Sequence, residues 1–408
     1  MRYCSFCKTA ENEVKRIVHS DFASICGRCV DMVVESMAPK TQAEGQTVEP
    51  VGPPPTPKAI KAHLDAHVIG QERAKVAISV GLYNHYKRRT QAGQEERDVE
   101  IEKSNIMLLG PTGTGKTLLA RIAAKILGVP FYAPDATSLT QAGYVGNDVE
   151  SILQGLISAA GGDLEKAKWG IVFLDEIDKI ARKSGRSASG DRDITGEGVQ
   201  QALLKLIEGT LVSVPKGGMK AMGQGADELD TSNILFIVSG SFAGIEEIVR
   251  RRVNARTKMG FGSEAKKEVD LTEVYRSATE DDILAFGLIP EFVGRFPVVT
   301  STLPLTEEQM CQILTEPKGA LVKQYRALFA MDNIDLVFEP EAIRAIGKKA
   351  MKRPTAARAL RAIVEELVNP AIFELSGNPN VRSVRITEDA VEGRGDPAVI
   401  YESLQRVG

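Results

Sequence analysis

The chain contains 408 residues, of which 43% are hydrophobic and 26% are charged, and its formal net charge is -3. A chain of this length is expected to form two or three domains, and the small net charge excludes a global attraction to nucleic acid or to an anionic membrane. No apolar run approaches the roughly eighteen residues that a membrane-spanning helix needs, and the N-terminus lacks the apolar region of a signal peptide. We therefore expect a cytoplasmic protein with neither a membrane nor a nucleic acid as partner.

Four of the five cysteines stand in two close pairs near the N-terminus, Cys4 with Cys7 and Cys26 with Cys29. Their spacing, C-x2-C-x18-C-x2-C, is within the range of structural zinc sites, in which four thiolates leave no position open for catalysis. Zinc would stabilise a unit that is too small to fold alone, so we predict a zinc-binding domain over residues 1–38. A redox-active pair of CxxC motifs and a zinc ribbon that binds nucleic acid are the alternatives.

A proline-rich stretch at residues 39–58 predicts an extended linker. Beyond it, short apolar runs that end in polar or small residues alternate with helical patterns. Continuous apolar strands that alternate with helices are typical of a parallel sheet covered on both faces. The sequence therefore predicts an α/β fold, with a large domain over residues 59–303. The three predicted strands are residues 105–109, 170–174 and 233–238.

Three polar, glycine-containing stretches interrupt the large domain and are predicted to be long loops; they are residues 182–198, 215–230 and 254–280. After Pro304 the pattern becomes mainly helical, which predicts a smaller, mostly helical domain over residues 304–408. Pro370 would kink or break the last of its helices at Asn369. The helices predicted in this domain are residues 307–329, 340–351 and 355–375, and its strands lie near residues 334–338 and 381–386.

The first apolar run ends in a segment that fits G-x-x-x-x-G-K-[ST], directly after a predicted strand and at the start of a predicted helix. Its glycines allow backbone N–H groups to converge on phosphate oxygens, and the helix N-terminus adds positive potential. Lys116 would reach the outer phosphates, and Thr117 would contact a magnesium ion. We predict that ATP is bound by Pro111, Thr112, Gly113, Thr114, Gly115, Lys116, Thr117 and Leu118.

Two carboxylates, Asp175 and Glu176, end the second apolar run. In a parallel sheet this position lies at the edge where nucleotides bind. Asp175 would hold magnesium, directly or through water, and Glu176 would orient and polarise the attacking water. The third run ends in Ser239, Gly240 and Ser241, and the Ser239 hydroxyl could hydrogen-bond that water. The spacing does not settle which residue does so, and a plain strand terminus accounts for this segment equally well.

The P-loop, the run Leu-Asp-Glu-Ile-Asp-Lys at 174–179, the segment Gly-Tyr-Val-Gly at 143–146 and the cysteine unit together resemble the ClpX family of ATP-dependent unfoldases in the AAA+ superfamily. The similarity covers nearly the whole chain, including the order of domains. It implies a homohexameric ring that hydrolyses ATP and threads unfolded or tagged protein substrates through its pore. It also implies adaptor proteins and a ClpP-type peptidase as partners; a remodelling chaperone that acts without a peptidase is the alternative.

The resemblance also assigns roles to residues that the chain's own pattern leaves open. Tyr144 and Val145 would line the pore and grip the substrate. Arg295 would reach the nucleotide of the neighbouring subunit, whereas Arg358 would touch the phosphates within its own subunit, so both join Glu176 as catalytic residues. Val68 and Ile69 would pack on the adenine, and the family usually has glycine where Ala356 stands.

Two segments depart from the family's pattern. Met259, Gly260 and Phe261 stand where the family carries an Ile-Gly-Phe-type tripeptide that docks on the peptidase ring, and methionine can fill the same apolar cleft with poorer shape definition. The stretch at 215–222 keeps two lysines but lacks the family's dense Arg-Lys-His cluster at the pore entrance. We therefore expect substrates that differ from the usual tagged ones.

Overall fold

The computed structural model describes residues 4–5, 9–10, 17–19, 24–26, 29, 55–91, 101–140, 147–182, 194–215, 226–257 and 270–401. The chain divides into two compact units, Met1–Glu49 and Pro50–Gly408. In the first unit, β1 (Ile17–His19) pairs with β2 (Ser24–Cys26) as an antiparallel hairpin. Within the described ranges, no helix is both long and apolar enough to cross a membrane.

A five-stranded parallel sheet forms the centre of the second unit, in the order β11-β3-β10-β7-β4. All residues of β3, β7 and β10 in the middle of the sheet are buried, which confirms the predicted α/β class and its three apolar strands. The two edge strands lacked a signal in the sequence, because β4 is only two residues long and β11 carries two hydroxyl residues. The strands are β3 (Ile106–Leu109), β4 (Phe131–Tyr132), β7 (Ile171–Leu174), β10 (Leu235–Gly240) and β11 (Val298–Ser301).

Two hydrophobic cores lie on opposite faces of this sheet. Ile106 and Leu108 of β3 point into one core, and Met107 and Leu109 point into the other. Alternate side chains of a strand face opposite ways, so both faces must be apolar, and this is why the strands read as unbroken apolar runs. The first core is covered by α2 (Pro57–Asp65), α3 (Glu72–Gln91) and α4 (Lys116–Leu127). The elements on the other face include α5 (Ser151–Ala159), α6 (Leu164–Ala167), η3 (Ile177–Ile180), α7 (Ile194–Glu208) and α8 (Ile245–Thr257).

The three predicted loops were too long, because their ends form helices or strands. Within 215–230, β9 (Ala226–Asp230) pairs antiparallel with β8 (Leu211–Pro215). Val214 and Leu229 of this hairpin are buried in the core of the large lobe, and tertiary packing of this kind outweighs weak strand propensity. Helices also occupy parts of the other two stretches. The remaining elements are η2 (Ala136–Ser138), β5 (Leu139–Thr140), β6 (Asn147–Asp148), α9 (Leu271–Ser277), α10 (Glu280–Phe286) and α11 (Pro290–Val293).

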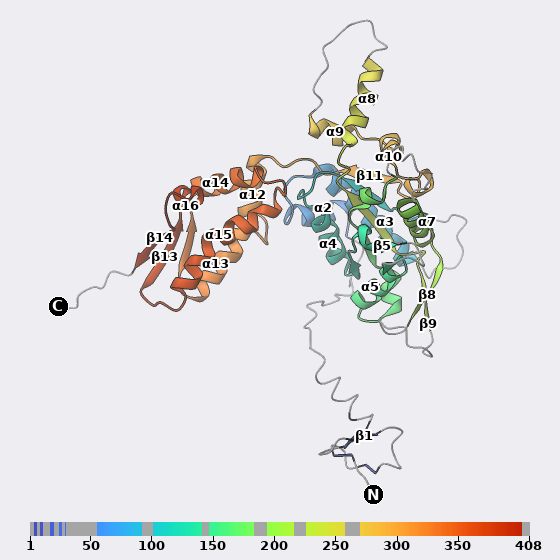
Figure 1. Ribbon diagram of the computed structural model, residues 1–408, viewed down its shortest axis with the longest axis horizontal. Coiled ribbons are helices and arrows are strands. Elements are labelled where there is room, and N and C mark those ends of the chain that lie inside the picture. Colours follow the sequence, from blue (N-terminus) through green and yellow to red (C-terminus); the bar gives the residue numbers. More distant parts are fainter. Residues whose placement is uncertain are drawn as a thin grey trace, which may run out of the picture. The chain divides into compact units, whose positions relative to one another are not determined.

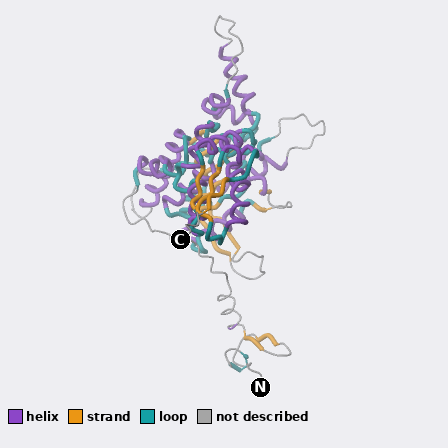
Figure 2. The backbone as a smooth tube through the Cα atoms, turned by 90° about the vertical axis from the view of Figure 1, so that its left-hand side faces the viewer, coloured by secondary structure: helices purple, strands orange, loops and turns teal. Residues whose placement is uncertain are grey.

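The small lobe, from α12 to β14, is a three-stranded sheet with helices packed on it (Figures 1 and 2). The helix predicted over 307–329 is two helices, separated at Pro317, which lacks the N–H that a continuing helix needs. Of the predicted kink or break at Asn369, the break was wrong, because α15 continues through Pro370. Buried side chains on both sides of Pro370, such as Val368 and Leu375, anchor this helix in the core of the lobe. The elements are α12 (Glu307–Thr315), α13 (Leu321–Met331), β12 (Asp335–Phe338), α14 (Pro340–Met351), α15 (Arg358–Leu375), β13 (Val381–Ile386), α16 (Glu388–Glu392) and β14 (Ala398–Tyr401).

The turn between α2 and α3 is tied to the segment that joins the large sheet to the small lobe. The Gln71 amide donates a hydrogen bond to the Leu303 carbonyl (2.9 Å) and accepts one from the Leu303 N–H (2.7 Å). Lys318 of the small lobe donates its backbone N–H to the Ala66 carbonyl. The turn therefore fixes both the end of β11 and the start of the small lobe.

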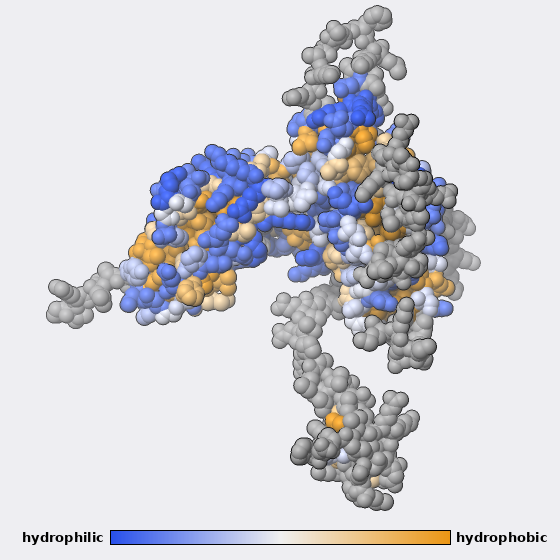
Figure 3. All heavy atoms as spheres, viewed as in Figure 1, coloured by the Kyte–Doolittle hydropathy of each residue, from blue (hydrophilic) through white to orange (hydrophobic). Residues whose placement is uncertain are grey.

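Apolar side chains remain exposed on the small lobe, and Figure 3 shows apolar atoms at its surface. Met331 at the end of α13 is 78% exposed, and Phe373 near the end of α15 is 91% exposed. The large lobe also has exposed apolar side chains, such as Leu211 at 68%. Large apolar side chains of this kind can be covered when another protein binds.

Candidate nucleotide-binding site

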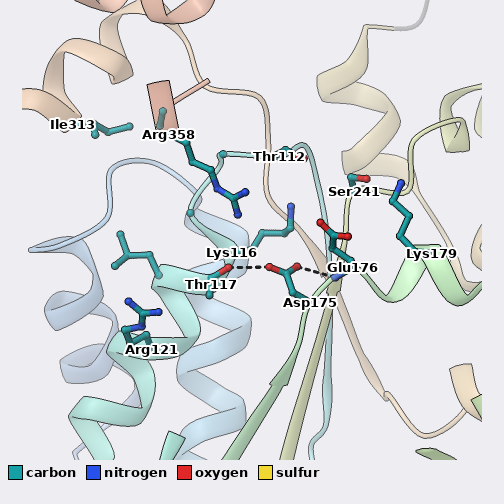
Figure 4. A pocket seen from close by; sticks show the side chains of 14 residues that line it. Thr112, Lys116, Thr117, Arg121, Asp175, Glu176, Lys179, Ser241, Ile313 and Arg358 are labelled. Atoms are coloured by element: carbon teal, nitrogen blue, oxygen red, sulfur yellow. Dashed lines mark hydrogen bonds between the residues drawn. The ribbon is translucent and has the colours of Figure 1, made fainter. Parts of the chain in front are cut away.

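A pocket of about 550 Å³ lies at the carboxyl ends of β3, β7 and β10 (Figure 4). Polar and charged side chains come from the large lobe, and a few residues come from the small lobe. This is the edge of a parallel sheet at which ligands bind. The residues that line the pocket are Thr112, Gly113, Gly115, Lys116, Thr117, Leu118, Arg121, Asp175, Glu176, Lys179, Ser241, Ile313, Ala357 and Arg358.

The glycines of the P-loop are required by the space around them. A Cβ on Gly110 would lie 2.1 Å from the Thr302 hydroxyl, and a Cβ on Gly113 would lie 2.4 Å from the Thr355 carbonyl oxygen. Gly115 precedes α4 with φ 93, a left-handed conformation that glycine adopts without strain. The first N–H groups of α4 have no capping side chain, so they can receive the oxygens of a phosphate.

Lys116 is buried beneath the loop. Its Nζ donates hydrogen bonds to the carbonyl oxygens of Gly110 (2.6 Å) and Pro111 (2.9 Å). Burial lowers the pKa of Lys116 to about 8, although nearby Asp175 and Asp178 favour the charged form. Phosphate oxygens would favour the charged form further, so this lysine is placed to bind an anion.

Asp175 is the centre of a hydrogen-bonded group. It accepts hydrogen bonds from the Thr117 hydroxyl (3.1 Å) and from the Ser239 hydroxyl (2.6 Å). The hydroxyl of Thr117 and the carboxylate of Asp175 are hard oxygen donors of the kind that Mg²⁺ prefers. The two residues predicted to hold magnesium therefore lie together, and Ser239 directs its proton to Asp175.

Glu176 follows Asp175 and lines the pocket with an exposed side chain. Its φ is 57, which is uncommon for a residue other than glycine. The backbone N–H of Glu176 donates to the Asp175 carboxylate (3.0 Å). In Figure 4 the Glu176 carboxylate points into the pocket, where it can polarise a water molecule.

The small lobe contributes Ile313, Ala357 and Arg358 to the pocket. Arg358 is the first residue of α15, and Figure 4 shows its guanidinium group directed toward the P-loop. A ligand in this pocket would therefore touch both lobes.

Four predicted nucleotide-binding residues, Val68, Ile69, Pro111 and Thr114, are not among those lining the pocket. Thr114 instead braces the loop, because its hydroxyl donates to the Pro111 carbonyl (2.9 Å) and hydrogen-bonds the Thr302 hydroxyl (2.7 Å). Val68 is buried behind Gly115. Their contact with a nucleotide stays a prediction.

Sequence reasoning missed Arg121, Lys179 and Ser241. Arg121 stands four residues after Thr117 in α4, so helical spacing could have placed both on one face. Lys179 gave no usable signal, and the run that contains Ser239 and Ser241 did not settle which of its residues reaches the site, because this depends on how β7 and β10 end.

Arg295 lies at the opposite, amino-terminal edge of the sheet, away from the pocket of its own chain. Its guanidinium forms an ion pair with Glu208, and its backbone carbonyl accepts a hydrogen bond from the Asn105 amide (3.1 Å). Together with Arg88 and Lys103, it lines a second pocket, of about 260 Å³.

The cysteine unit brings Cys4, Cys26 and Cys29 together. All three are buried, and their sulfur atoms lie within 4.8 Å of one another. The Cys26 N–H also donates to the Cys4 sulfur (3.3 Å). Clustered thiolates of this kind fit tetrahedral zinc, and Cys7, the fourth predicted ligand, lies outside the described residues.

Other predicted residues also lie outside the described part of the chain. These are the pore residues Tyr144 and Val145 and the docking residues Met259, Gly260 and Phe261.

A sheet with a P-loop, an acidic strand end and a small lobe that closes the pocket defines an ATPase of the AAA+ class. Three protein families match the chain: "AAA domain (Cdc48 subfamily)" over residues 101–299, "C-terminal, D2-small domain, of ClpB protein" over residues 305–385, and "ClpX C4-type zinc finger" over residues 2–38. The ATP-dependent Clp protease ATP-binding subunit ClpX of Treponema denticola is 50% identical over 375 residues, covering 91% of this chain and 89% of that protein.

The chain therefore belongs to the ClpX family. This confirms the resemblance drawn from the motifs, the AAA+ fold with its helical C-terminal lobe, and the ATPase activity. It also confirms zinc, ATP and magnesium as the cofactors.

Proposed function

We propose that this protein is an ATP-dependent unfoldase and translocase that threads protein substrates through the pore of a hexameric ring and feeds a ClpP-type peptidase. The observation that carries the proposal is the pocket in which Lys116, Asp175 and Glu176 converge beneath Arg358 of the small lobe. Membership of the ClpX family supports the same conclusion.

The chain's own residues account for hydrolysis. Lys116 would exchange the carbonyls of Gly110 and Pro111 for phosphate oxygens, and Thr117 with Asp175 would hold magnesium. The metal, when bound, neutralises charge that develops on the phosphoryl group. Glu176 would orient and polarise the attacking water. These donors and acceptors are fixed in place and need little rearrangement during the reaction, which lowers the barrier to hydrolysis.

Motion would follow from the contacts that the nucleotide makes with both lobes. Arg358 would touch the phosphates from the small lobe, and Ile313 also lines the pocket. A ligand can shift the balance between two arrangements only by binding them with different affinity, and ATP and ADP differ in the phosphate that Arg358 would reach. Loss of that phosphate would therefore move one lobe against the other.

Assembly is supported by two features of the chain. Arg295 lies far from its own pocket and would act in the site of a neighbouring subunit, which makes hydrolysis depend on the ring. The exposed apolar side chains of the small lobe, such as Met331 and Phe373, would be covered in an assembly. Both features fit a homohexamer.

The other assignments follow the sequence. Tyr144 and Val145 would grip the substrate, and Met259, Gly260 and Phe261 would dock on the peptidase in the cytoplasm. The domains proposed are the zinc-binding domain at 1–38, which receives adaptors, the linker at 39–58, the large ATPase domain at 59–303 and the small domain at 304–408.

The substitution Glu176→Gln tests the proposal. We expect ATP binding and assembly to be kept, because the amide preserves shape, while hydrolysis falls by about 10³-fold or more and unfolding of a model substrate stops. Phosphate release and nucleotide titration measure the two effects. Retained hydrolysis would overturn the assignment of Glu176.

The substitution Tyr144→Ala separates translocation from simpler remodelling. A translocase should lose substrate unfolding and keep much of its ATPase activity, and Tyr144→Phe should retain both because the ring remains. Intact unfolding by Tyr144→Ala would argue against a gripping pore residue.

Methionine at 259 favours a second candidate, a remodelling chaperone that acts without a peptidase. Co-purification with a ClpP-type peptidase in ATP distinguishes the two, with Met259→Ile and Phe261→Ala as comparisons. Binding of the ring by Met259→Ile alone would favour this second candidate.

A further inference from the structure

A second pairing of a carboxylate with a serine lies next to the pairing of Asp175 with Ser239. The Asp178 carboxylate accepts one hydrogen bond from the backbone N–H of Ser241 (3.1 Å) and another from its hydroxyl (3.1 Å). Asp178 is only 7% exposed. A carboxylate with both oxygens engaged by one residue holds that residue in a fixed position.

The approach of these two residues depends on the glycine between the serines. A Cβ on Gly240 would lie 2.6 Å from the nearer Asp178 carboxylate oxygen, closer than any side chain allows. The Tyr275 hydroxyl donates to the Ser241 carbonyl (2.8 Å) and fixes the same residue from its other side. Ser241 is therefore held at its N–H, hydroxyl and carbonyl.

Glu176 stands between the two pairings. Asp175 precedes it and accepts its N–H, and Asp178 follows it in η3. The left-handed backbone of Glu176, at φ 57, persists only where its surroundings fix it. Asp175 bound to Ser239, and Asp178 bound to Ser241, fix the chain on both sides of this residue.

We propose that Asp178 and Ser241 are positioning residues that hold Glu176 in the conformation that directs its carboxylate into the pocket. The proposal rests on the proposed role of Glu176 in activating water. Figure 4 shows Ser241 on the side of the pocket where the Glu176 carboxylate lies. Lys179, which forms an ion pair with Asp178 at 3.6 Å, approaches from the solvent side.

The decisive variant is Ser241→Ala in the full chain. It removes the hydroxyl bond and leaves the N–H bond, so the protein should fold. We expect kcat for ATP hydrolysis to fall about three- to tenfold while KM and ATP affinity change less than about twofold. Ser241→Thr keeps a hydroxyl and should restore most of the rate, and Asp178→Asn should lower kcat further than Ser241→Ala.

Ser376→Ala is the matched control, because the Ser376 hydroxyl also donates to a carboxylate, that of Asp332 (2.9 Å), and neither residue lines the pocket. It should leave kcat unchanged. If Ser241→Ala lowered the thermal midpoint but not kcat, or raised KM instead, the positioning role would be wrong.

The background of Glu176→Gln separates this proposal from the proposed function. In that background, Ser241→Ala should have no further effect on the residual rate, because the group that it positions is gone. Full hydrolysis by Glu176→Gln would overturn the proposed role of Glu176 in hydrolysis, whereas an additional loss from Ser241→Ala would refute only the positioning role.

Discussion

The two edges of the central sheet are built differently. At the carboxyl edge, Lys116 is 8% exposed, and the charged groups bond one another or the loop around them. At the amino edge, the Arg295 side chain is 52% exposed and pairs with Glu208 at the surface. At the first edge, the polar groups that line the pocket all come from one chain. At the second edge, Arg295 is the cation proposed to act in the site of a neighbouring subunit.

The largest expected effect tests this contrast at Arg295. We expect Arg295→Ala to lower ATP hydrolysis by about 10³-fold, because charge on the phosphoryl group is no longer stabilised, while ATP binding changes less than about twofold. Phosphate release and nucleotide titration measure the two quantities. Arg276→Ala, which removes an exposed arginine from a local ion pair, is the control.

Mixing subunits then shows in which chain Arg295 acts. An assembly of Arg295→Ala and Glu176→Gln subunits contains some interfaces with both groups intact if Arg295 acts on its neighbour. Hydrolysis should then return when the two inactive proteins are mixed. If the mixture stays inactive although it assembles, Arg295 does not act in the site of the neighbouring subunit.

A buried histidine near the amino edge gives a large pH effect on stability. His85 hydrogen-bonds the Trp169 carbonyl (3.1 Å), and burial lowers its pKa from 6.5 to about 4. The unfolded chain takes up a proton below pH 6.5, whereas the folded chain does so only near pH 4. Stability from this group is therefore full above pH 6.5 and is lost as the pH falls toward 4.

Between pH 7.5 and 5 we expect a loss of about 2 kcal/mol in the free energy of unfolding, measured by urea titration of the large lobe. His85→Gln keeps a donor for the Trp169 carbonyl but does not titrate, so it should flatten this part of the profile. An unchanged pH slope in that variant would assign the effect to other groups.

Asn105 tests how the amino edge is held. It is 3% exposed, accepts a hydrogen bond from the Phe236 N–H (3.1 Å) and donates one to the Arg295 carbonyl (3.1 Å). Asn105→Asp places an acceptor against that carbonyl and should lower the free energy of unfolding by about 1–3 kcal/mol. The rate of ATP hydrolysis should fall by a larger factor than the affinity for ATP, because only the edge with Arg295 is disturbed.

Asn84→Asp is the control, because the Asn84 amide makes only a long contact of 3.4 Å with the Ser104 hydroxyl. If thermal unfolding showed equal losses of stability in the two variants, Asn105 would not be needed to hold Arg295 in place.

The smallest expected effect is at the carboxyl edge, where Ala356 lies against the P-loop. Ala356 has φ 45, a left-handed conformation that favours glycine. Ala356→Gly should raise the free energy of unfolding by up to about 1 kcal/mol, because relief of strain is partly offset by a more flexible unfolded chain. Ala357→Gly, at φ -61, should lower it. If both variants lowered the free energy of unfolding, Ala356 would not be strained.

Much of the fold followed from local patterns. The three middle strands read as apolar runs because both faces of the sheet are buried. The edge strands and the hairpin of β8 with β9 were missed, because short or amphipathic strands depend on what packs beside them. Pro370 does not break α15, since core packing on both sides outweighs the hydrogen bond that proline removes.

The candidate site was predictable where one short segment carries the chemistry. The P-loop and the cysteine spacing could each be interpreted alone, and they indicated nucleotide and zinc. The acidic end of β7 indicated magnesium only in combination with the P-loop. Arg121, Lys179 and Ser241 could not be found in this way, because each reaches the pocket from a segment whose own pattern is ordinary.

The sequence by itself determined which ions and nucleotide this protein is equipped to bind, because phosphate loops and metal ligands lie in short segments of fixed spacing. Only the tertiary structure decided which distant residues meet. The strand order β11-β3-β10-β7-β4 brings Ser239 to Asp175, which follows β7, and Ser241 to Asp178 of η3, and Arg295 lies at the far edge. Such contacts depend on how strands are ordered, and periodicity along the chain carries no information about that order.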